Sequence, residues 1–428
     1  MKYILEIQNG LKSNYIVEEF TNGTLIDKYS IDYFVKIKLI NNRRTYFLYD
    51  KNYVFIDSVY EYINFIHLNS SDNTKMRLIY TLRKLFVFKS ILNKNFIDWK
   101  LHDYIKFKSF LNGSNFDAND FILLINSDLS LQSIKMIIGI CKGFFKYLKI
   151  IDYKYFDENN RIYNSRNSHY QPKSFNDDDI NRIFETIEQT NYSYELMLKI
   201  KCIILLMLEN GLRIGEVLGL TFEDLKVKKF DNNEKAVIVL IRNRISNSLK
   251  QQAKRTLSIN SYKQYESKQY NSKDIGYQLT VISINLFNMI NEYIDISHER
   301  LKKNKNYIKS KADCVDPNLG GTNNYIFLND SNGSPLCYNS WNKIAKTILI
   351  KSGIEIDKVY KKINLSHRFR HTYIMNLLYK YKIPSNTVIH FSRHSNISSL
   401  DPYNNLTNIE LIFHYENIER LNEVYNDK

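Results

Sequence analysis

The most informative stretch of the 428-residue sequence is His367-Arg368-Phe369-Arg370-His371-Thr372. Another arginine lies far upstream in Asn210-Gly211-Leu212-Arg213-Ile214-Gly215-Glu216, and downstream Ser392-Arg393-His394 is followed, nine positions after its histidine, by Tyr403. Arginine presents a planar fork of donors to phosphate oxygens, histidine can move a proton near neutral pH, and tyrosine can hold phosphate covalently. The combination predicts a site that attacks a phosphodiester and needs neither a metal nor a cofactor.

The three segments resemble the sequence boxes of the tyrosine recombinases, the phage-integrase family of enzymes that break and rejoin DNA. The first family box reads Thr-Gly-Leu-Arg-x-x-Glu and corresponds to residues 210–216, and the second, His-x-x-Arg-His-Thr, is complete at residues 367–372. The third usually reads Leu-Gly-His followed by Tyr, but here Arg393 stands where the family has glycine. The resemblance runs from about Ser174 to about Asn405, with the boxes in the family's order and spacing.

The resemblance implies a role for each of five residues. Tyr403 would attack the phosphodiester and become linked to the 3′ phosphate. Arg213 and Arg370 would hold the non-bridging oxygens and stabilise the extra negative charge of the pentavalent transition state. His367 would accept or relay a proton near Tyr403, and His394 would hydrogen-bond the phosphate, since histidine suits either role near neutral pH.

A lysine completes the expected set. In family members a lysine on a β-hairpin after the first box protonates the departing 5′ oxygen, and the basic segment from Asn247 to Thr256 occupies that place. Lys250 fits the usual offset to the following strand better than Lys254, so Lys250 is the predicted acid, although a loop lysine in a basic chain is ordinarily a solvated charge or a phosphate contact. Glu216 in the first box is expected to orient neighbouring groups through hydrogen bonds.

Less specific interpretations exist for the same residue types. Most of the 33 tyrosines must pack in cores or lie on the surface, and Tyr415, whose spacing from the third box is wrong, is the reserve nucleophile. The pairs His367/His371 and His390/His394 are each spaced by four and could hold a metal, but no carboxylate or cysteine cluster accompanies them. His371 and His390 are therefore interpreted as structural or supporting groups.

The composition favours a polyanionic partner. A formal net charge of +15 suits DNA, whose condensed counterions are displaced by Lys and Arg.

Four dispersed cysteines form no Cys-x-x-Cys pair, which argues against a zinc ribbon or a disulfide framework and favours a reducing cytoplasm. The most apolar run, Ile203–Leu208, is far shorter than the roughly 20 residues of a membrane span, and the first residues lack a signal-peptide apolar region. We therefore expect a bacterial, nucleoid-associated cytoplasmic protein with no membrane insertion.

Hydrophobic periodicity predicts a mostly α-helical fold with small β elements. Residues 1–50 are expected to form a β-rich N-terminal extension with a turn at Asn22-Gly23. Residues 51–155 carry apolar stripes at helical spacing and would form, by the resemblance, a helical core-type DNA-binding domain. The polar residues 156–174 are the predicted linker, and residues 175–428 the predicted tyrosine-recombinase catalytic domain, which is mixed but mainly helical and ends in a tail helix.

Within the predicted catalytic domain, the pattern indicates individual elements. A helix is expected to start after Ser174, where three successive aspartates favour the positive end of a helix dipole. The other expected elements are helices at 196–208, 279–296 and 408–425, strands at 236–241 and 256–259, and a basic insertion or surface loop at 298–324.

The sequence thus predicts a site-specific DNA recombinase, an integrase or transposase of a mobile element that works through a 3′-phosphotyrosine intermediate. The resemblance implies a homo-tetramer on paired sites in double-stranded DNA, with accessory DNA-bending or directionality proteins as further candidate partners. Two alternatives stay open. One is a topoisomerase-like or telomere-resolving enzyme with the same chemistry, and the other is a DNA-binding regulator that no longer cuts, against which the complete set of site residues argues.

Overall fold

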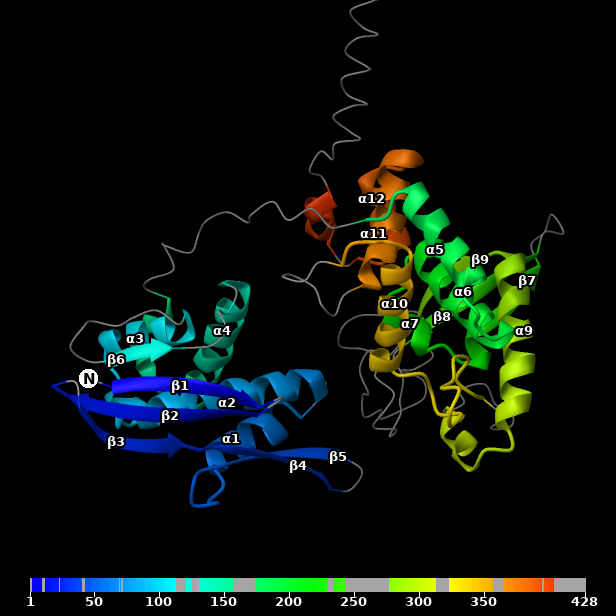
Figure 1. Cartoon of the computed structure of the whole chain (residues 1–428). Helices are drawn as coiled ribbons and strands as arrows, with labels where there is room; N and C mark the ends of the chain where they lie inside the picture. Colours follow the sequence, from blue (N-terminus) through cyan, green and yellow to red (C-terminus); the bar gives the residue numbers. More distant parts are fainter. Residues whose placement is uncertain are drawn as a thin grey trace, which may run out of the picture. The chain divides into compact units, whose positions relative to one another are not determined.

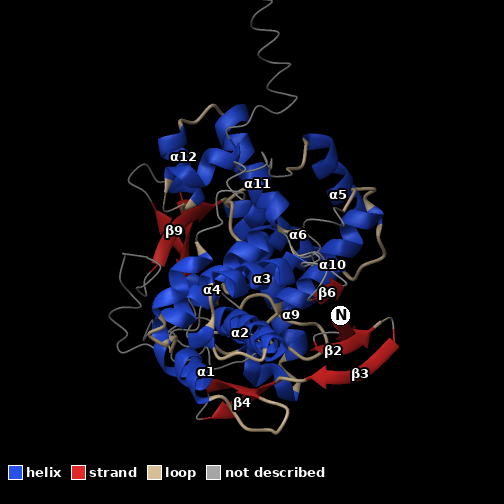
Figure 2. Cartoon of the chain, turned by 90° about the vertical axis from the view of Figure 1, so that its left-hand side faces the viewer, coloured by secondary structure: helices blue, strands red, loops and turns tan. Residues whose placement is uncertain are grey.

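The computed structural model describes residues 2–9, 12–22, 24–40, 43–68, 70, 72–112, 121–124, 129, 131–157, 174–229, 235–242, 277–312, 323–356, 365–394 and 396–403. The chain divides into two compact units, Met1–Ser168 and His169–Lys428, and each is described by itself (Figure 1). Helices predominate and the sheets are small (Figure 2), which confirms the predicted fold class. No helix in the described ranges is long and apolar enough to cross a membrane.

The first unit contains a mixed sheet and a separate hairpin. Its strands are β1 (Lys2–Asn9), β2 (Lys12–Thr21), β3 (Thr24–Ile31), β4 (Phe34–Ile40), β5 (Arg43–Tyr49) and β6 (Phe121–Leu124). The sheet has the order β3-β2-β1-β6, in which only the pair of β1 and β6 is parallel, and β4 pairs with β5 in antiparallel register. Asn22 takes a φ of 49° in the turn between β2 and β3, a conformation that asparagine tolerates well.

The helices of the first unit share a core with these strands. They are α1 (Asp57–Glu61), α2 (Asp72–Leu92), α3 (Leu101–Asn112) and α4 (Leu131–Tyr147), together with a π segment, η1 (Tyr62–Ile66), and two 3₁₀ segments, η2 (Phe96–Asp98) and η3 (Ile151–Phe156). The apolar stripes of the helices are buried, and Tyr15, Val17 and Leu48 from the strands join them in one aromatic-rich core. Strands and helices of this unit therefore share one core.

The second unit is built around helix α6. Its helices are α5 (Asp177–Gln189), α6 (Tyr194–Leu208), α7 (Ile214–Leu218), α9 (Ile284–Leu301), α10 (Tyr338–Lys351), α11 (His367–Met375) and α12 (Ser385–Ser392). The short segments are η5 (Phe222–Asp224), η6 (Lys305–Ser310), η8 (Asn376–Lys380) and η9 (Ile397–Tyr403), and β7 (Leu225–Lys229), β8 (Lys235–Arg242) and β9 (Tyr277–Ile282) form an antiparallel sheet in that order. Helix α6 packs against α5, α7, α9 and α11, so its end is a natural place to assemble residues from several elements.

Two helix starts in this unit follow from local chemistry. The Asn176 side chain accepts from Asp179 N at 2.6 Å while the Asp179 side chain accepts from Asn176 N at 3.4 Å, which is a capping box at the start of α5. Ser193 Oγ accepts from Leu196 N at 3.3 Å at the start of α6. The helices predicted after Ser174 and over 196–208 are confirmed, as is the strand at 236–241.

The prediction of a helix at 279–296 is wrong in its first part. Residues 277–282 form β9, which pairs with β8, and Ser283 then caps α9 by accepting a 3.1 Å hydrogen bond from Leu286 N. Residues 280–282 are three successive β-branched side chains, which fit a strand better than a helix. Pairing with β8 therefore prevails over the helical periodicity of the apolar residues.

The described part of 298–324 is not the expected surface loop. His298 is buried in the last turn of α9, where Nδ1 lies 2.8 Å from Tyr307 Oη and Nε2 lies 3.1 Å from Ile326 O. These bonds fold η6 and the segment near residue 326 onto the helix, because buried polar groups need partners. Residues 313–322 lie outside the described residues, as do most of the predicted linker, the predicted strand at 256–259 and the predicted tail helix at 408–425.

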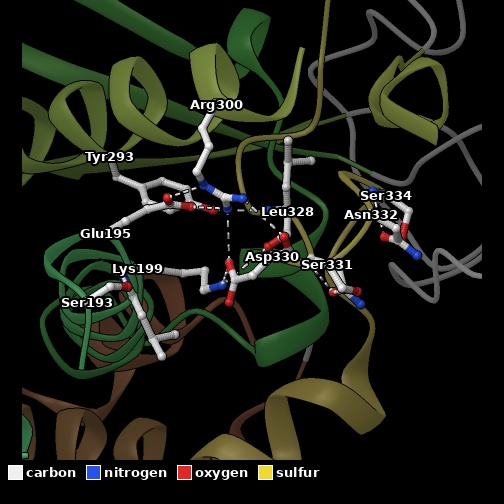
Figure 3. Close-up of polar contacts among 12 residues, drawn as sticks. Ser193, Glu195, Lys199, Tyr293, Arg300, Leu328, Asp330, Ser331, Asn332 and Ser334 are labelled. Atoms are coloured by element: carbon white, nitrogen blue, oxygen red, sulfur yellow. Dashed lines mark hydrogen bonds and ion pairs between the residues drawn. The ribbon is translucent and has the colours of Figure 1, made fainter. Parts of the chain in front are cut away.

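An ion-pair network ties the segment after Phe327 to two helices (Figure 3). Lys199 on α6 is buried, donates to Leu328 O at 3.4 Å and pairs with Asp330. Arg300 on α9 holds Glu195 through Nε at 2.6 Å and through Nη2 at 2.8 Å. Burial lowers the pKa of Lys199, and Asp330 opposes that shift. Two cations thus meet two carboxylates, and the group carries no surplus charge.

Candidate active site

A tight turn after α6 places the first arginine. Gly211 has a φ of +57°, and a Cβ there would lie 2.3 Å from Cδ1 of Tyr373, so both the backbone and the available space require glycine. Arg213 then becomes the N-cap of α7, where its backbone N donates to Glu216 Oε2 at 2.8 Å and its Nη1 donates to Glu216 Oε1 at 2.9 Å. The Arg213 side chain is 29% exposed and that of Glu216 only 3%, so a phosphate can reach the arginine.

Arg370, on α11, is almost fully buried, with 1% of its surface exposed. Its Nη1 donates to Gly211 O, its Nη2 donates to Ser392 O, and the same Nη2 lies 3.3 Å from His394 Nε2. Burial and the neighbouring Arg213 lower the pKa of Arg370 to about 9, so the guanidinium stays charged at neutral pH. Arg370 therefore joins the turn before α7 to the end of α12.

His394 follows α12 and is neutral in this environment. Burial, and then the positive charges of Arg370, Arg213 and Arg393, lower the pKa of His394 to about 4. Because arginine can only donate, Nε2 of His394 accepts from Arg370, and Nδ1 therefore donates to Ser392 Oγ at 2.7 Å. A phosphate anion beside Arg370 would favour the protonated imidazole, which could then donate to it.

Tyr403 ends η9 and is 5% exposed. Its hydroxyl is hydrogen-bonded to Nδ1 of His371, the two rings lie 5.3 Å apart, and its backbone oxygen accepts from the Tyr379 hydroxyl. Burial raises the pKa of Tyr403 to about 12, while Arg370 and Arg213 oppose the rise. A phenol with so high a pKa attacks only if a base removes its proton, and His371 is the base in contact with it.

His367 is the residue predicted to accept or relay a proton near Tyr403, and the structure shows a hydrogen bond from the Tyr403 hydroxyl to His371, one turn further along α11. The two histidines lie one turn apart on α11, and their rings stack 5.0 Å apart with an interplanar angle of 13°. Both histidines belong to the second family box. Their spacing along one helix face does not show which of them Tyr403, at the end of η9, will contact. His371, interpreted from the sequence as a supporting group, is therefore the candidate base. His367 stacks on it, and the charge of His367 helps to lower the pKa of His394.

Arg393 is the second residue whose role the sequence did not reveal. It caps α12 in the left-handed conformation, with φ 57° and ψ 39°, and its side chain turns inward. Nη1 donates to Asn210 O at 3.1 Å, and Nη2 donates to Gly211 O at 3.0 Å and to Glu216 Oε2 at 3.1 Å. Burial alone would raise the pKa of Glu216, but Arg393, Arg213 and Arg370 outweigh it and lower that pKa to about 2.

The described part of the site thus collects three arginines, one carboxylate, a neutral imidazole and a buried phenol from the α6–α7 turn, α11, the end of α12 and η9. Three positive charges against one negative charge leave a surplus that a phosphate group would neutralise. Lys250 and its alternative Lys254 lie outside the described residues, as does Tyr415. Within the described ranges no group of three His, Cys, Asp or Glu side chains is arranged to hold a metal ion.

The chain was compared with protein families, curated proteins and solved structures. Residues 173–409 match the phage integrase family. The XerH site-specific recombinase bound to palindromic difH substrate in a post-cleavage complex is 16% identical, with a TM-score of 0.52 over 82% of this chain and 80% of that one. The pre-cleavage complex of XerH with difH is 17% identical, with a TM-score of 0.50 over 80% of this chain and 78% of that one. No curated protein matches the sequence significantly.

The family match covers more than half of the chain and contains every described residue of the site. The structural likeness, at such low identity, adds the fold, which is that of the tyrosine recombinases. The chain therefore belongs to the phage integrase family.

Proposed function

We propose that this protein is a site-specific DNA recombinase that cuts and rejoins strands through a 3′-phosphotyrosyl link at Tyr403. The observation that carries the proposal is the hydrogen bond between the buried Tyr403 hydroxyl and His371, in a site whose charge surplus comes from three arginines. A nucleophile, a base and cations for the phosphoryl oxygens are the three parts that such a reaction needs.

In the cleavage step, His371 Nδ1 takes the proton of Tyr403 as its oxygen attacks phosphorus. A bond forms between Tyr403 Oη and phosphorus, and the bond from phosphorus to the 5′ oxygen breaks. Arg213 and Arg370 stabilise the added charge on the non-bridging oxygens, and His394 donates to one of them once the phosphate has raised its pKa. The departing 5′ oxygen takes a proton, for which Lys250 is the proposed donor.

Rejoining reverses these bonds with a 5′ hydroxyl from a partner strand. One phosphodiester bond forms for each phosphotyrosyl bond that breaks, so the reaction needs no external energy source. Because strands are exchanged between two duplexes, the proposed active assembly is a homo-tetramer on paired DNA sites, with DNA-bending or directionality proteins as candidate partners. The net charge of +15 supports binding to DNA, and the family supports a role in integration or transposition of a mobile element.

The decisive experiment uses purified full-length protein and duplexes from the flanks of its own gene, nicked so that a short 5′ fragment diffuses away after cleavage. We expect a denaturant-resistant protein–DNA adduct, with peptide mapping that places the DNA on Tyr403. Tyr403→Phe removes one oxygen and should abolish the adduct while DNA binding persists. An adduct that survives in Tyr403→Phe, or one that maps to another residue, would contradict the proposal.

A further inference from the structure

Arg393 occupies a backbone conformation that favours glycine. Six non-glycine residues in the described part of the chain have a positive φ: Asn22, Tyr53, Asn93, Lys149, Lys382 and Arg393. The first five are exposed, and Arg393 alone among the six is buried. A large side chain in the left-handed region is strained, so a favourable interaction inside the protein must hold it there.

The interactions of Arg393 converge on the two phosphate-binding arginines. Gly211 O accepts from Arg393 at 3.0 Å and also from Arg370, so one carbonyl serves two guanidinium groups. Glu216 accepts from Arg393 at 3.1 Å through Oε2 and from Arg213 at 2.9 Å through Oε1, so one carboxylate serves two as well. Arg393 therefore shares an acceptor with each arginine.

Burial decides what this sharing does. Arg393 and Glu216 form an ion pair whose side chains are both 3% exposed, and such a pair is strong only when its remaining donors and acceptors are satisfied. The carbonyls of Asn210 and Gly211 take two further donations from Arg393. The carboxylate is thus fixed by a buried partner, and the more exposed Arg213 is oriented by a group that cannot rotate away.

We propose that Arg393 is a positioning residue, which clamps Glu216 and the Gly211 turn so that Arg213 and Arg370 are in place before a phosphate arrives. This inference rests on the proposed strand-cutting function. Both Nη atoms of Arg393 donate to the turn and to Glu216, so Arg393 acts through these groups rather than on the phosphate. Preorganised charge lowers the reaction barrier because no reorganisation is needed during the chemical step.

The test compares Arg393→Gly with wild type in single-turnover cleavage at saturating DNA. Glycine keeps the backbone conformation and removes the guanidinium. We expect the cleavage rate constant to fall by about tenfold or more, since small misplacement of reacting groups is costly, while DNA affinity changes by less than about threefold because many other cations bind phosphates.

Guanidinium chloride at low millimolar concentration, with ionic strength held constant by NaCl, supplies a separate readout. The ion should enter the space left by Arg393→Gly, raise its thermal midpoint relative to wild type and restore part of the cleavage rate. A ligand that binds only the native state stabilises it by mass action. Lys199→Met, which removes the buried cation of the balanced network in Figure 3, is the matched control and should lose stability but not cleavage rate per folded molecule.

The outcomes separate the two proposals. A wild-type protein that forms no adduct would contradict the proposed function, and the thermal shift of Arg393→Gly by guanidinium would still test the clamp. A wild-type protein that cleaves, with Arg393→Gly equally fast at saturating DNA, would overturn the positioning role. Loss of rate in the glycine variant and in Lys199→Met to the same extent would also overturn it, because a general loss of stability would then explain both.

Discussion

Two ion-pair groups lie along helix α6 and differ in their charge balance. Near its start, Lys199 and Arg300 face Glu195 and Asp330, so positive and negative charges are equal. Beyond its end, Arg213, Arg370 and Arg393 face Glu216 alone. In the balanced group the charges neutralise one another, and the ion pairs connect two segments of the chain. In the other group a partly buried surplus of positive charge is neutralised only when an anion binds. The charge balance supports the proposal that the second group is the phosphate site, and it does so without reference to any motif.

The largest expected difference between the two groups concerns catalysis. Arg213→Ala and Arg300→Ala each remove a partly exposed arginine that is paired with one glutamate. Arg213→Ala should slow cleavage by about a hundredfold or more, on the order of 3 kcal/mol in the barrier, because a preorganised donor to the phosphoryl oxygens is lost. Arg300→Ala should cleave at the wild-type rate. Single-turnover assays at saturating DNA measure both, and equal rates for the two variants would refute the distinction.

The second prediction concerns the histidine that removes the proton of Tyr403. His371→Ala removes the imidazole in contact with the Tyr403 hydroxyl and should reduce cleavage by roughly a hundredfold, the usual scale for a general base. His367→Ala removes the ring that stacks on His371 and should cost less than about tenfold. The comparison of adduct formation rates decides, and a larger defect in His367→Ala would restore the assignment made from the sequence.

The third prediction concerns stability at low pH. The pKa of Glu216 is about 2 in the folded protein, below its ordinary value near 4.5, so the unfolded state binds the proton more readily. Stability from this carboxylate is therefore present above about pH 4.5 and is lost as pH falls towards 2, on the order of 3 kcal/mol in all. Denaturation by urea across this range should show a shallower pH slope in Glu216→Gln. An unchanged slope would mean that the charge of Glu216 is not held by the arginines.

The smallest expected effect is anion binding without DNA. Sulfate resembles a phosphate group, and at about ten times its dissociation constant it should stabilise the protein by about 1.4 kcal/mol, a shift of roughly 3–6 °C in the thermal midpoint. Sodium chloride at matched ionic strength should not reproduce the shift. Arg213→Ala should abolish it and Arg300→Ala should preserve it; a sulfate effect of the same size in both variants would mean that the anion binds elsewhere.

The sequence was most informative where a residue terminates an element. The structure brings Arg213, Arg370, His394 and Tyr403 together, and three of the four, Arg213, His394 and Tyr403, stand at the start or the end of a short helical segment, where spacing limits the possible positions. The choice between His367 and His371 depends on where η9 crosses α11, a tertiary distance that spacing within one helix does not contain. Such relations between elements require the packed chain.

Arg393 shows a different limit. Arg393 stands where the family has glycine, and its turn has the left-handed conformation that glycine favours, while its side chain points inward to Glu216. Nothing local predicts this, since the compensating carboxylate lies 177 positions away. The prediction for the residues of β9 was wrong for a similar reason. Their partner in the sheet is β8, which lies some 40 positions upstream.

The burial of Tyr403 has a practical consequence for chemical footprinting. With 5% of its surface exposed and its hydroxyl engaged by His371, this phenol should be among the slowest of the 33 tyrosines to react with a phenol-selective reagent. An increase in its labelling when DNA is added would report that the substrate uncovers the nucleophile. Constant labelling would mean that the bound DNA neither uncovers nor shields the nucleophile.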